Sequence, residues 1–425
     1  MRKTLVLLLL LCASLFAQSR SDGSRLVIRE VTVIDCTGSK PQPEMTVVIR
    51  GDRIAEIGKA AQIAIPKGAM VVEGKGKFLI PGLWDMHGHL TDAGEGALAQ
   101  LIENGVTGVR DLGGDLALVQ RWRREITSGR RTGPRIVAAG PFLDGPNTAN
   151  WRVIARTATE AREAVRSIKQ RGADFVKIHN ALPREAFFAA AAEARKQAIP
   201  LAVHLPQEVT IAEASEAGAS SLEHVEMLVQ SALREQDAAM KSRDETTRFD
   251  AALASLTGDN GAALWALLVK NHTWYVPTLV AYERGFVLWS NKPEALWPRR
   301  SVHWRQMDVI AAMHKAGVKM MAGTDFSDWA LVPGVDLHNE LALLVESGFS
   351  PMEALQAATS MPAEFLGRTA EFGTVERGKL ADLVLLDADP IESISHTRKI
   401  RAVIVGGKLV PVAEMRDAMV QPTRR

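Results

Sequence analysis

Eight short apolar segments, each with the pattern of a β-strand, alternate with longer segments along the middle of the chain. Most of the gaps have the length of a helical crossover, and TEAREAVRSIKQRGA and REAFFAAAAEARKQA have helical patterns. The predicted strands lie at residues 78–89, 105–112, 134–141, 174–180, 200–206, 220–226, 273–279 and 318–325. Eight strand–helix repeats are typical of an α/β fold of the (β/α)8 TIM-barrel type. A doubly wound open sheet, which usually has fewer repeats, is the alternative.

Both ends of the chain have a different pattern, rich in short strands. Turn sequences occur at Gly51-Asp52 near the N-terminus and at Gly406-Gly407 near the C-terminus. Because exposed strand edges tend to pair, we expect the two ends to form one small β-sandwich. The predicted units are residues 22–75 and 371–415 for the sandwich, and residues 76–370 for the barrel.

Two insertions interrupt the repeats, at about residues 230–270 and 280–300. Both follow late barrel strands, so we expect them to lie over the carboxyl-terminal face of the barrel.

The first residues have the features of an export signal. A short basic segment precedes the apolar run LVLLLLLCASLFA, which is short for a membrane span, and Ala17 is a suitable cleavage position. We expect residues 1–17 to be removed and the protein to be periplasmic or secreted; an uncleaved anchor is the alternative. Cleavage removes Cys12 and leaves Cys36, so we expect no intramolecular disulfide. After cleavage no stable membrane span is expected.

The charge balance argues against some classes of partner. The chain has 51 lysines and arginines and 49 aspartates and glutamates, a formal net charge of +2. This balance favours neither a nucleic acid nor an acidic membrane as a partner. We expect a small-molecule substrate, and a homo-oligomer is compatible with the sequence.

Metal-ligating side chains occur at the ends of several predicted strands. His87 and His89 lie two residues apart, and residues at this spacing in a β-strand point to the same face. Two imidazoles that converge at a strand end can bind a divalent transition metal. The strand ends that follow carry Lys177, His179, His204, His224 and Asp325. Because the carboxyl ends of barrel strands meet at one face, these residues together predict a metal site.

The motifs that contain these residues resemble the amidohydrolase superfamily, and within it the imidazolonepropionase-like and prolidase-like metal-dependent hydrolases. The motifs are PGLWDMHGHL, VKIHN, AVHLP, LEHVE, AGTD and ELALLVESGFSPMEALQAAT, followed by GTVERGKLADLVLLDADP. The resemblance covers nearly all of the mature chain and includes the split β-sandwich.

The resemblance implies two divalent metal ions. By it, His87 and His89 hold the more buried ion with Asp325, whereas His204 and His224 hold the more exposed ion. Zinc is the default metal, and manganese, cobalt or iron would also fit this ligand set.

Lys177 is implied to bridge the two metals as a carboxylated (N6-carboxy) lysine. Divalent metals would repel an ammonium group, whereas a neutral lysine can react with carbon dioxide to form an anionic ligand with two oxygens. The alternatives for Lys177 are a salt bridge, or a contact with substrate beside a single metal.

The expected reaction is hydrolysis of a carbon–nitrogen bond in a dipeptide, an N-acyl amino acid or a cyclic amide, with a hydroxide shared by two metals as the nucleophile. Asp325 is expected to accept the proton of the nucleophile and pass it to the leaving nitrogen. Asp85 and Asp111 are expected to support the site, since ligating imidazoles need an acceptor for their second N–H. Alternatives are hydrolysis of an ester, lactone or phosphoester, and metal or ligand binding without catalysis.

The residues that would contact the substrate are less well defined by sequence. The candidates are His179, Tyr275, His338, Asn147, Asn150 and Arg152. Several prolidase-like relatives carry a histidine in the loop after the third strand, but GPFLDGPNTANWR has none. This departure puts dipeptidase specificity in doubt, although an arginine and asparagines could still bind a carboxylate.

Overall fold

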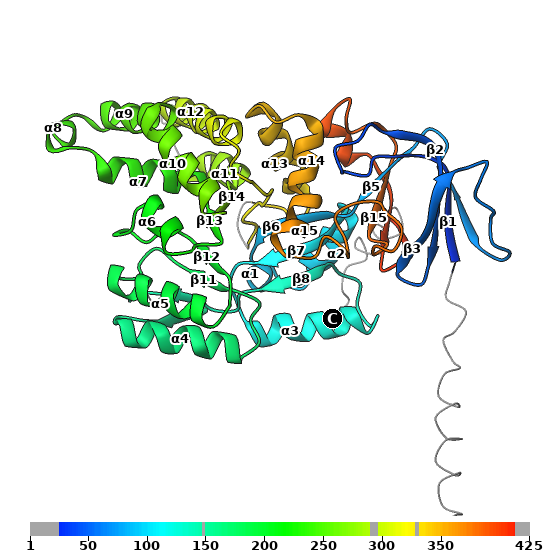
Figure 1. Ribbon diagram of the computed structural model, residues 1–425, viewed down its shortest axis with the longest axis horizontal. Coiled ribbons are helices and arrows are strands. Elements are labelled where there is room, and N and C mark those ends of the chain that lie inside the picture. Colours follow the sequence, from blue (N-terminus) through cyan, green and yellow to red (C-terminus); the bar gives the residue numbers. More distant parts are fainter. Residues whose placement is uncertain (1–24, 147–148, 290–295, 328–330, 413–425) are drawn as a thin grey trace, which may run out of the picture.

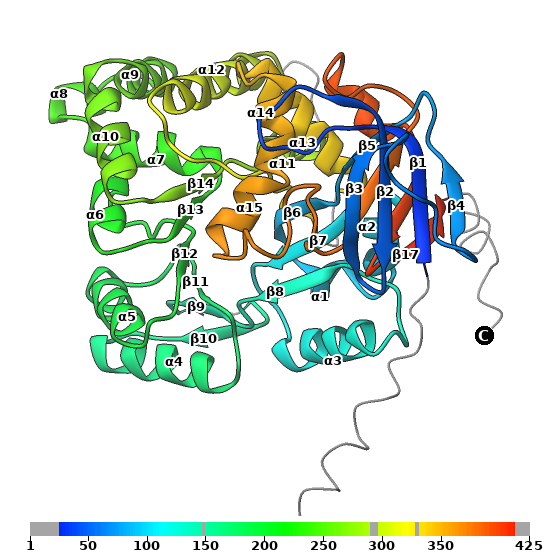
Figure 2. The same ribbon diagram turned by 45° about the vertical axis from the view of Figure 1, so that its right-hand side comes forward.

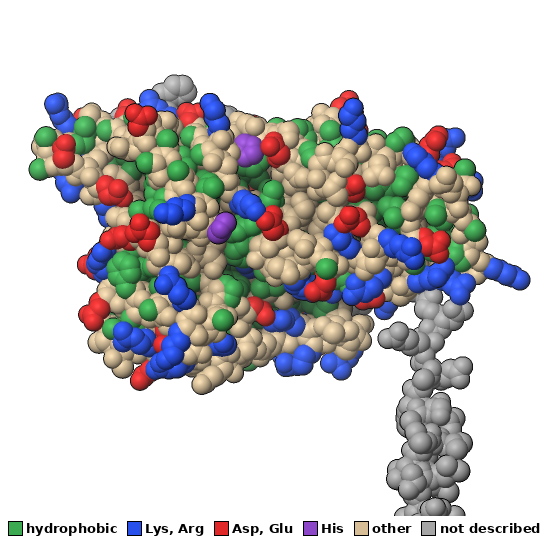
Figure 3. Space-filling model, viewed as in Figure 1, with side chains coloured by type: hydrophobic (Ala, Val, Ile, Leu, Met, Phe, Trp, Pro, Cys, Tyr) green, Lys and Arg blue, Asp and Glu red, His purple; other side chains and the backbone are tan. Residues whose placement is uncertain are grey.

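The computed structural model describes residues 25–146, 149–289, 296–327 and 331–412. The predicted export signal at residues 1–17 and the candidate Asn147 therefore lie outside the described residues. Figure 1 shows a β-sheet unit built from both ends of the chain beside a larger unit of strands and helices. On the face drawn in Figure 3, basic and acidic side chains are interspersed.

The β-sheet unit contains eight strands in one sheet (Figure 2). The strands are β1 (Arg25–Val33), β2 (Gln42–Arg50), β3 (Arg53–Lys59), β4 (Met70–Glu73), β5 (Phe78–Pro81), β15 (Leu383–Leu386), β16 (Ile400–Val405) and β17 (Lys408–Pro411). Their order is β17-β16-β15-β5-β1-β2-β3, and β4 pairs with β1. The two predicted turns are confirmed, because Gly51-Asp52 joins β2 to β3 and Gly406-Gly407 joins β16 to β17.

Strand β5 joins the two ends of the chain in this sheet. It pairs parallel with β1 and antiparallel with β15. Leu79 of β5 lies in a hydrophobic cluster with Ile28, Val47 and Leu385, separate from the main core. The predicted boundary at residue 76 is therefore too early, since residues 78–81 belong to the β-sheet unit and not to the first barrel strand.

The larger unit has parallel strands in two sheets. The strands are β6 (Leu83–Gly88), β7 (Val106–Asp111), β8 (Arg135–Ala138), β9 (Phe142–Asp144), β10 (Arg152–Ile154), β11 (Val176–Ile178), β12 (Leu201–Val203), β13 (Ser221–Glu223) and β14 (Trp274–Val276). The sheet orders are β6-β7-β8 and β10-β9-β11-β12-β13-β14. The α/β character is as predicted, and seven of the predicted segments contain a strand at the expected place. The pair β9 and β10 was not predicted.

Residues 318–325, predicted as the eighth strand, form no regular strand: Met320 makes an isolated parallel bridge with Tyr275, and the next residue, Phe326, makes one with Gly88. The backbone is still bonded on both sides, since the Tyr275 N–H donates to Lys319 and the Met86 N–H donates to Ala322. The extended run ends at Asp325, which has a positive φ of 64°. A regular strand cannot continue through this conformation.

Helices follow most of the strands and cover them (Figures 1 and 2). They are α1 (Leu90–Ala93), α2 (Gly96–Glu103), α3 (Leu116–Thr127), α4 (Ala158–Gln170), α5 (Arg184–Lys196), α6 (Ile211–Glu216), α7 (Val225–Glu235), α8 (Ala238–Lys241), α9 (Glu245–Thr257), α10 (Asp259–Lys270), α11 (Leu279–Trp289), α12 (Leu296–Lys315), α13 (Val335–Glu346), α14 (Pro351–Ala357), α15 (Ser360–Phe365) and the 3-10 helix η2 (Ile394–Arg398). The two helical patterns noted in the sequence correspond to α4 and α5. Helix α4 begins at a capping box, in which Thr157 and Glu160 bind each other's backbone N–H.

The two insertions are helical. Residues 230–270 form most of α7 together with α8, α9 and α10, and the second insertion contains α11 and the start of α12. These helices gather at one end of the larger unit, away from the β-sheet unit (Figure 1). No single helix among the described residues is long and apolar enough to cross a membrane. Helices α9 and α10 together have the length and composition for a span, but they are bent by 54° relative to each other.

Candidate metal centre and active site

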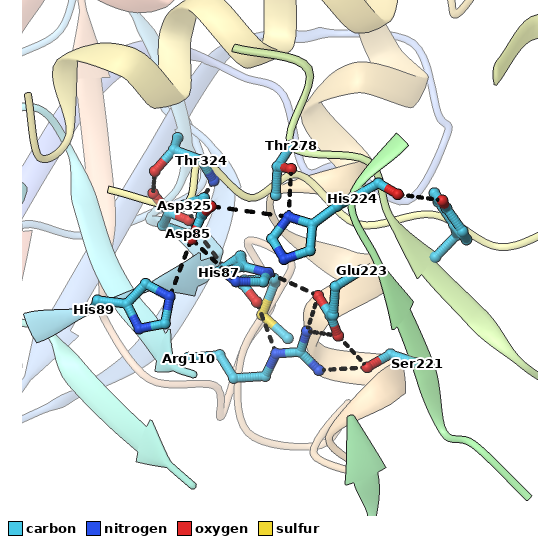
Figure 4. Close-up of polar contacts among 12 residues, drawn as sticks. Asp85, His87, His89, Arg110, Ser221, Glu223, His224, Thr278, Thr324 and Asp325 are labelled. Atoms are coloured by element: carbon cyan, nitrogen blue, oxygen red, sulfur yellow. Dashed lines mark hydrogen bonds and ion pairs between the residues drawn. The ribbon is translucent and has the colours of Figure 1, made fainter. Parts of the chain in front are cut away.

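His87 and His89 converge on Asp325 (Figure 4). His87 lies near the end of β6, and His89 directly precedes α1. Their Nε2 atoms lie 3.3 Å and 3.0 Å from Oδ1 of Asp325. The two imidazoles and the carboxylate therefore meet at one point, as their positions in the sequence predicted.

His204 and His224 follow β12 and β13 at the same end of the strands. The ring centroid of His224 lies 4.5 Å from that of His87 and 4.8 Å from that of His204. One ligand atom each from His87, His224 and Asp325 lie within 4.8 Å of one another, close enough to hold a metal ion. His204 stacks on His179 with 4.6 Å between the ring centroids.

Lys177, on β11, is 1% exposed, and its charge interacts with His89, His204 and Asp325 of this cluster. Its Nζ atom is buried and makes no hydrogen bond within the described part of the chain. Burial lowers the pKa of Lys177 to about 8. A buried lysine normally has a paired charge, so an unpaired amine beside three imidazoles and a carboxylate fits a lysine modified to ligate a metal.

Glu223 orients His87 from the side away from Asp325 (Figure 4). Its Oε2 lies 2.9 Å from Nδ1 of His87, and Arg110 Nη2 donates to both carboxylate oxygens at 2.7 and 2.9 Å. Burial alone would raise the pKa of Glu223, but the positive charge of Arg110 and the hydrogen bond to His87 together outweigh it and hold that pKa well below its usual range. The carboxylate accepts a hydrogen bond from Nδ1–H, which leaves Nε2 free to ligate a metal.

This pair was not assigned from the sequence, although both residues lie in quoted segments. Ser221 and Glu223 share one face of β13, and Arg110 donates to the Ser221 hydroxyl at 2.9 Å and to the Met86 carbonyl at 2.7 Å. The sequence signal was the carboxylate directly before His224 in LEHVE.

Asp85 and Asp111 bind backbone N–H groups beside the site and not, as predicted, the imidazoles of the ligating histidines. Asp85 accepts hydrogen bonds from the backbone N–H of His87 at 3.1 Å and of Thr324 at 3.0 Å. Asp111 accepts from the backbone N–H of Leu90 at 2.8 Å. Both carboxylates thus hold backbone beside the histidines and make no hydrogen bond to an imidazole in the described structure, which corrects the expectation.

The Nδ1 atoms of His224 and His89 face neutral hydrogen-bond partners and not carboxylates. His224 Nδ1 lies 3.0 Å from the Thr278 hydroxyl, and His89 Nδ1 lies 3.3 Å from the Gly113 carbonyl. Among the three, only His87 is held by a carboxylate, which makes the Glu223 contact the strongest support in the site.

Backbone strain gathers around the site. His224, Thr278 and Asp325 have φ values of 72°, 49° and 64°. A non-glycine residue in this region costs on the order of 1–3 kcal/mol and persists where the surroundings enforce it. A Cβ at Gly323 would lie 2.8 Å from the His87 Cβ, so a glycine is required for this close approach.

The Asp144 carboxylate contacts both His179 and Arg152 at the edge of the site. Its Oδ2 lies 2.9 Å from Arg152 Nε and 3.3 Å from His179 Nδ1. The Arg152 guanidinium lies 4.7 Å from the ring centroid of Phe142, which in turn packs against His179. The candidates Arg152 and His179 are therefore near the metal-ligand cluster, while the side chain of Asn150 is exposed.

The side chains of Tyr275 and His338 are both buried. The buried Tyr275 hydroxyl donates to the His224 carbonyl at 2.7 Å. His338 is buried in α13, and its ring nitrogens lie 2.9 Å from the Thr397 hydroxyl and 3.1 Å from the Asn104 carbonyl. Both were candidates for substrate contact, and the structure corrects this, because their polar atoms are already used inside the protein.

One acidic side chain at this end has no assigned role. Glu226 is the second residue of α7, two positions after His224, and it is half-buried. Burial raises the pKa of Glu226 to about 7, and the negative charge of Asp325 adds to the rise.

Comparison with known proteins places this geometry in a family. The sequence profile of the Amidohydrolase family matches residues 78–410. An imidazolonepropionase from Rubrobacter xylanophilus is 25% identical over 396 residues, which cover 86% of this chain and 91% of that protein. An adenine deaminase from the same organism is 35% identical, but over 77 residues that span 18% of this chain and only 13% of the deaminase.

Solved structures are similar over nearly the whole chain. An Xaa-Pro dipeptidase with methionine bound in its active site has a TM-score of 0.72 and 25% identity, and the match covers 91% of this chain and 100% of the dipeptidase. Phenylurea hydrolase B has a TM-score of 0.69 and 25% identity, with coverage of 93% and 98%. With a profile match over most of its length, the chain belongs to the amidohydrolase family.

Proposed function

We propose that this protein is a metal-dependent hydrolase that cleaves a carbon–nitrogen bond in a small substrate. Family membership supports a hydrolase of this kind. The single observation that carries the proposal is the buried, unpaired amine of Lys177 among histidines and Asp325. A structural lysine would have a carboxylate partner, and a binding protein has no need of the strained Asp325.

The residues that would hold metal are His87, His89, His204, His224 and Asp325, with Lys177 as a carboxylated bridge between two ions, zinc by default. The donor set fits, because imidazole nitrogens and carboxylate oxygens converge and the pKa of Lys177 is lowered by burial to about 8. A lysine that is partly neutral near pH 7 can add carbon dioxide. When bound, such ions polarise a carbonyl oxygen and lower the pKa of water.

Asp325 is the group that would move the proton. Burial alone would raise its pKa, but the electrostatic interaction with His87 and the close contacts with the ring nitrogens of His87 and His89 hold that pKa well below its usual range. It is therefore ionised and can accept a proton as the water oxygen bonds to the carbonyl carbon. The same proton then passes to the nitrogen as the carbon–nitrogen bond breaks, which gives a carboxylic acid and an amine.

The strands would position these groups as a closed barrel. The Asp174 N–H donates to the Ala138 carbonyl at 2.8 Å, which links β11 to β8. Residues 318–325 lie between β14 and β6 through the bridges at Met320 and Phe326. We propose that β6, β7, β8, β11, β12, β13, β14 and this segment close into a (β/α)8 barrel. Residues 25–81 and 371–412 would then be the companion β-sandwich.

We further propose that the enzyme is exported and that its substrate is a small molecule. The basic and apolar start of the chain supports export, and the mature N-terminus tests it. Secreted or periplasmic protein that still begins at Met1 would show that the segment is not cleaved.

The substrate is tested by a panel. Metal-loaded enzyme would be assayed with Xaa-Pro and other dipeptides, N-acyl amino acids, cyclic amides such as imidazolonepropionate, esters, lactones and phosphotriesters. We expect one of the amide classes to give the highest kcat/KM. Rapid turnover of esters or phosphotriesters without any amide hydrolysis would show that the proposed reaction is wrong.

A further inference from the structure

Glu340 is a buried carboxylate that the proposed mechanism does not use. It lies in α13 and begins the segment ELALLVESGFSPMEALQAAT. Its Oε1 accepts the backbone N–H of Leu279 at 3.1 Å, and its Oε2 accepts that of Val280 at 2.8 Å. These two residues open α11, and N–H groups in a first helical turn have no partner within their own helix. Glu340 therefore caps α11 from a neighbouring helix.

The residue in the usual capping position is Thr278, whose side chain is used elsewhere. Thr278 directly precedes α11, where a threonine normally has an extended backbone and caps the helix with its own hydroxyl. Here Thr278 has a φ of 49°, and its hydroxyl lies 3.0 Å from Nδ1 of His224 (Figure 4). This φ is unfavourable for a β-branched residue and persists only where the surroundings enforce it. The two N–H bonds to Glu340 fix the backbone directly after Thr278.

The residues before α11 also hold the backbone of His224. The His224 N–H donates to the Val276 carbonyl at 2.9 Å, and the Val225 N–H donates to the Pro277 carbonyl at 2.9 Å. Together with the hydroxyl of Thr278, these acceptors belong to three consecutive residues. The position and the orientation of the imidazole therefore depend on where α11 begins.

Stability alone does not explain a glutamate at this place. Glu340 is buried, and no basic side chain pairs with it in the part of the chain that the structure describes. A buried carboxyl group without a counter-ion is costly, and capping by the hydroxyl of Thr278 would avoid that cost. With Glu340 as the cap, the hydroxyl remains available to His224.

We propose that Glu340 is a positioning residue for His224. By capping α11 it holds Thr278 in its unusual conformation, and the Thr278 hydroxyl then accepts a hydrogen bond from Nδ1–H of His224 and leaves Nε2 to face a metal ion. The inference rests on the proposed metal site. It makes metal affinity depend on α13, a helix that carries none of the proposed ligands.

A double-mutant cycle with Thr278 tests the proposal. Zinc affinity would be measured by competition with a chelator in the wild type, in Glu340→Gln, in Thr278→Val and in the double variant. Thr278→Val should weaken one zinc equivalent by roughly tenfold, the lower end of the usual effect, because the lost partner is neutral. Glu340→Gln turns an amide NH2 toward a backbone N–H. It should weaken the same equivalent by roughly 3–10-fold, but by less than about twofold where residue 278 is already valine.

¹⁵N NMR of the metal-free protein measures the same contact without metal or substrate. In the wild type the His224 ring should carry its proton on Nδ1, and in Glu340→Gln part of the population should carry it on Nε2. Glu353→Gln is the matched control, since Glu353 accepts the Ser350 N–H at 2.8 Å at the start of its own helix, α14. This control should change neither the zinc affinity nor the tautomer of His224.

Two results would overturn the proposal. An equal loss of zinc affinity from Glu340→Gln in both Thr278 backgrounds would show that Glu340 acts on the fold and not through Thr278. Wild-type zinc affinity with an unchanged tautomer in Glu340→Gln would show that Glu340 does not position His224. If thermal unfolding shows that Glu340→Gln does not fold, Glu340→Asp takes its place in the cycle. If no variant and no wild-type protein binds zinc, the proposed metal site is wrong, and the tautomer of His224 still decides the role of Glu340.

Discussion

The hydrogen bond between Glu223 and His87 provides a sharp test of how the site is built. We expect Glu223→Gln to weaken metal binding at His87 by roughly 10–100-fold, the usual effect of removing the partner of a ligating histidine. This corresponds to about 1.4–2.7 kcal/mol, since each tenfold change in affinity is about 1.4 kcal/mol. The 2.9 Å contact to a charged acceptor has a similar net worth, about 1.5–3 kcal/mol.

The physical reason is the position of the proton on His87. Both oxygens of Glu223 accept from Arg110, Oε1 also accepts from Ser221 at 2.5 Å, and Oε2 faces His87. A glutamine replaces one oxygen with an N–H donor. At the Oε2 position this donor faces Nδ1 and forces the tautomer with the proton on Nε2, which is the nitrogen that must ligate the metal.

The assay is a competition titration with a chelator of known zinc affinity, combined with ¹⁵N NMR of the histidine rings to identify the tautomer. Ser221→Ala is the control, because it removes a hydrogen bond from Glu223 and leaves the carboxylate on His87. It should bind metal within about threefold of wild type, since a neutral hydrogen bond contributes about 1 kcal/mol or less. Wild-type affinity and an unchanged tautomer in Glu223→Gln would refute the assigned role of Glu223.

Four further variants test other parts of the structure. Lys177→Ala should lose about one of two metal equivalents and most activity, measured by elemental analysis and initial rates; full retention of both would exclude a bridging lysine. Asp325→Asn should lower kcat by at least roughly 10²–10⁴-fold, and near-normal turnover would exclude proton transfer by Asp325. Tyr275→Phe should reduce the free energy of unfolding by about 1 kcal/mol through loss of the bond to His224, with KM unchanged; a large rise in KM would return Tyr275 to the substrate site. Burial lowers the pKa of His338 to about 3. The unfolded chain therefore binds the proton first, and this residue reduces stability by about 1.4 kcal/mol per pH unit as pH falls below about 6.5. Denaturant titrations of His338→Gln should lack that contribution, and an unchanged slope would contradict it.

The order of strands and the positions of the ligands could be predicted because both depend on local patterns. Short apolar runs separated by helices indicate a parallel sheet, and carboxyl ends of such strands meet at one edge. His87, Lys177, His204 and His224 each lie at or directly after such an end. Their convergence therefore needed no knowledge of the loops.

Partners across the sheet could not be predicted in the same way. Arg110 and Glu223 lie 113 positions apart in sequence and meet only because β7 and β13 face a common interior. His338 had the sequence context of a residue near the site, but the packing of α13 turns it toward Asn104 and Thr397. Helix periodicity defines a buried face and does not specify what that face contacts.

The strained and unpaired groups of the site are stronger evidence for metal-assisted chemistry than the fold is. The same strand arrangement supports many reactions, so it cannot by itself distinguish a hydrolase from a binding protein. A fold selected only for stability would not keep an unpaired Lys177, nor positive φ angles at His224 and Asp325. Each of these features is unfavourable in the protein alone and becomes favourable when Lys177 is carboxylated and a metal ion is shared among the three side chains. Because the unfavourable groups belong to three different strand ends and converge on one point, a common ligand explains them together, whereas separate structural explanations would be needed for each.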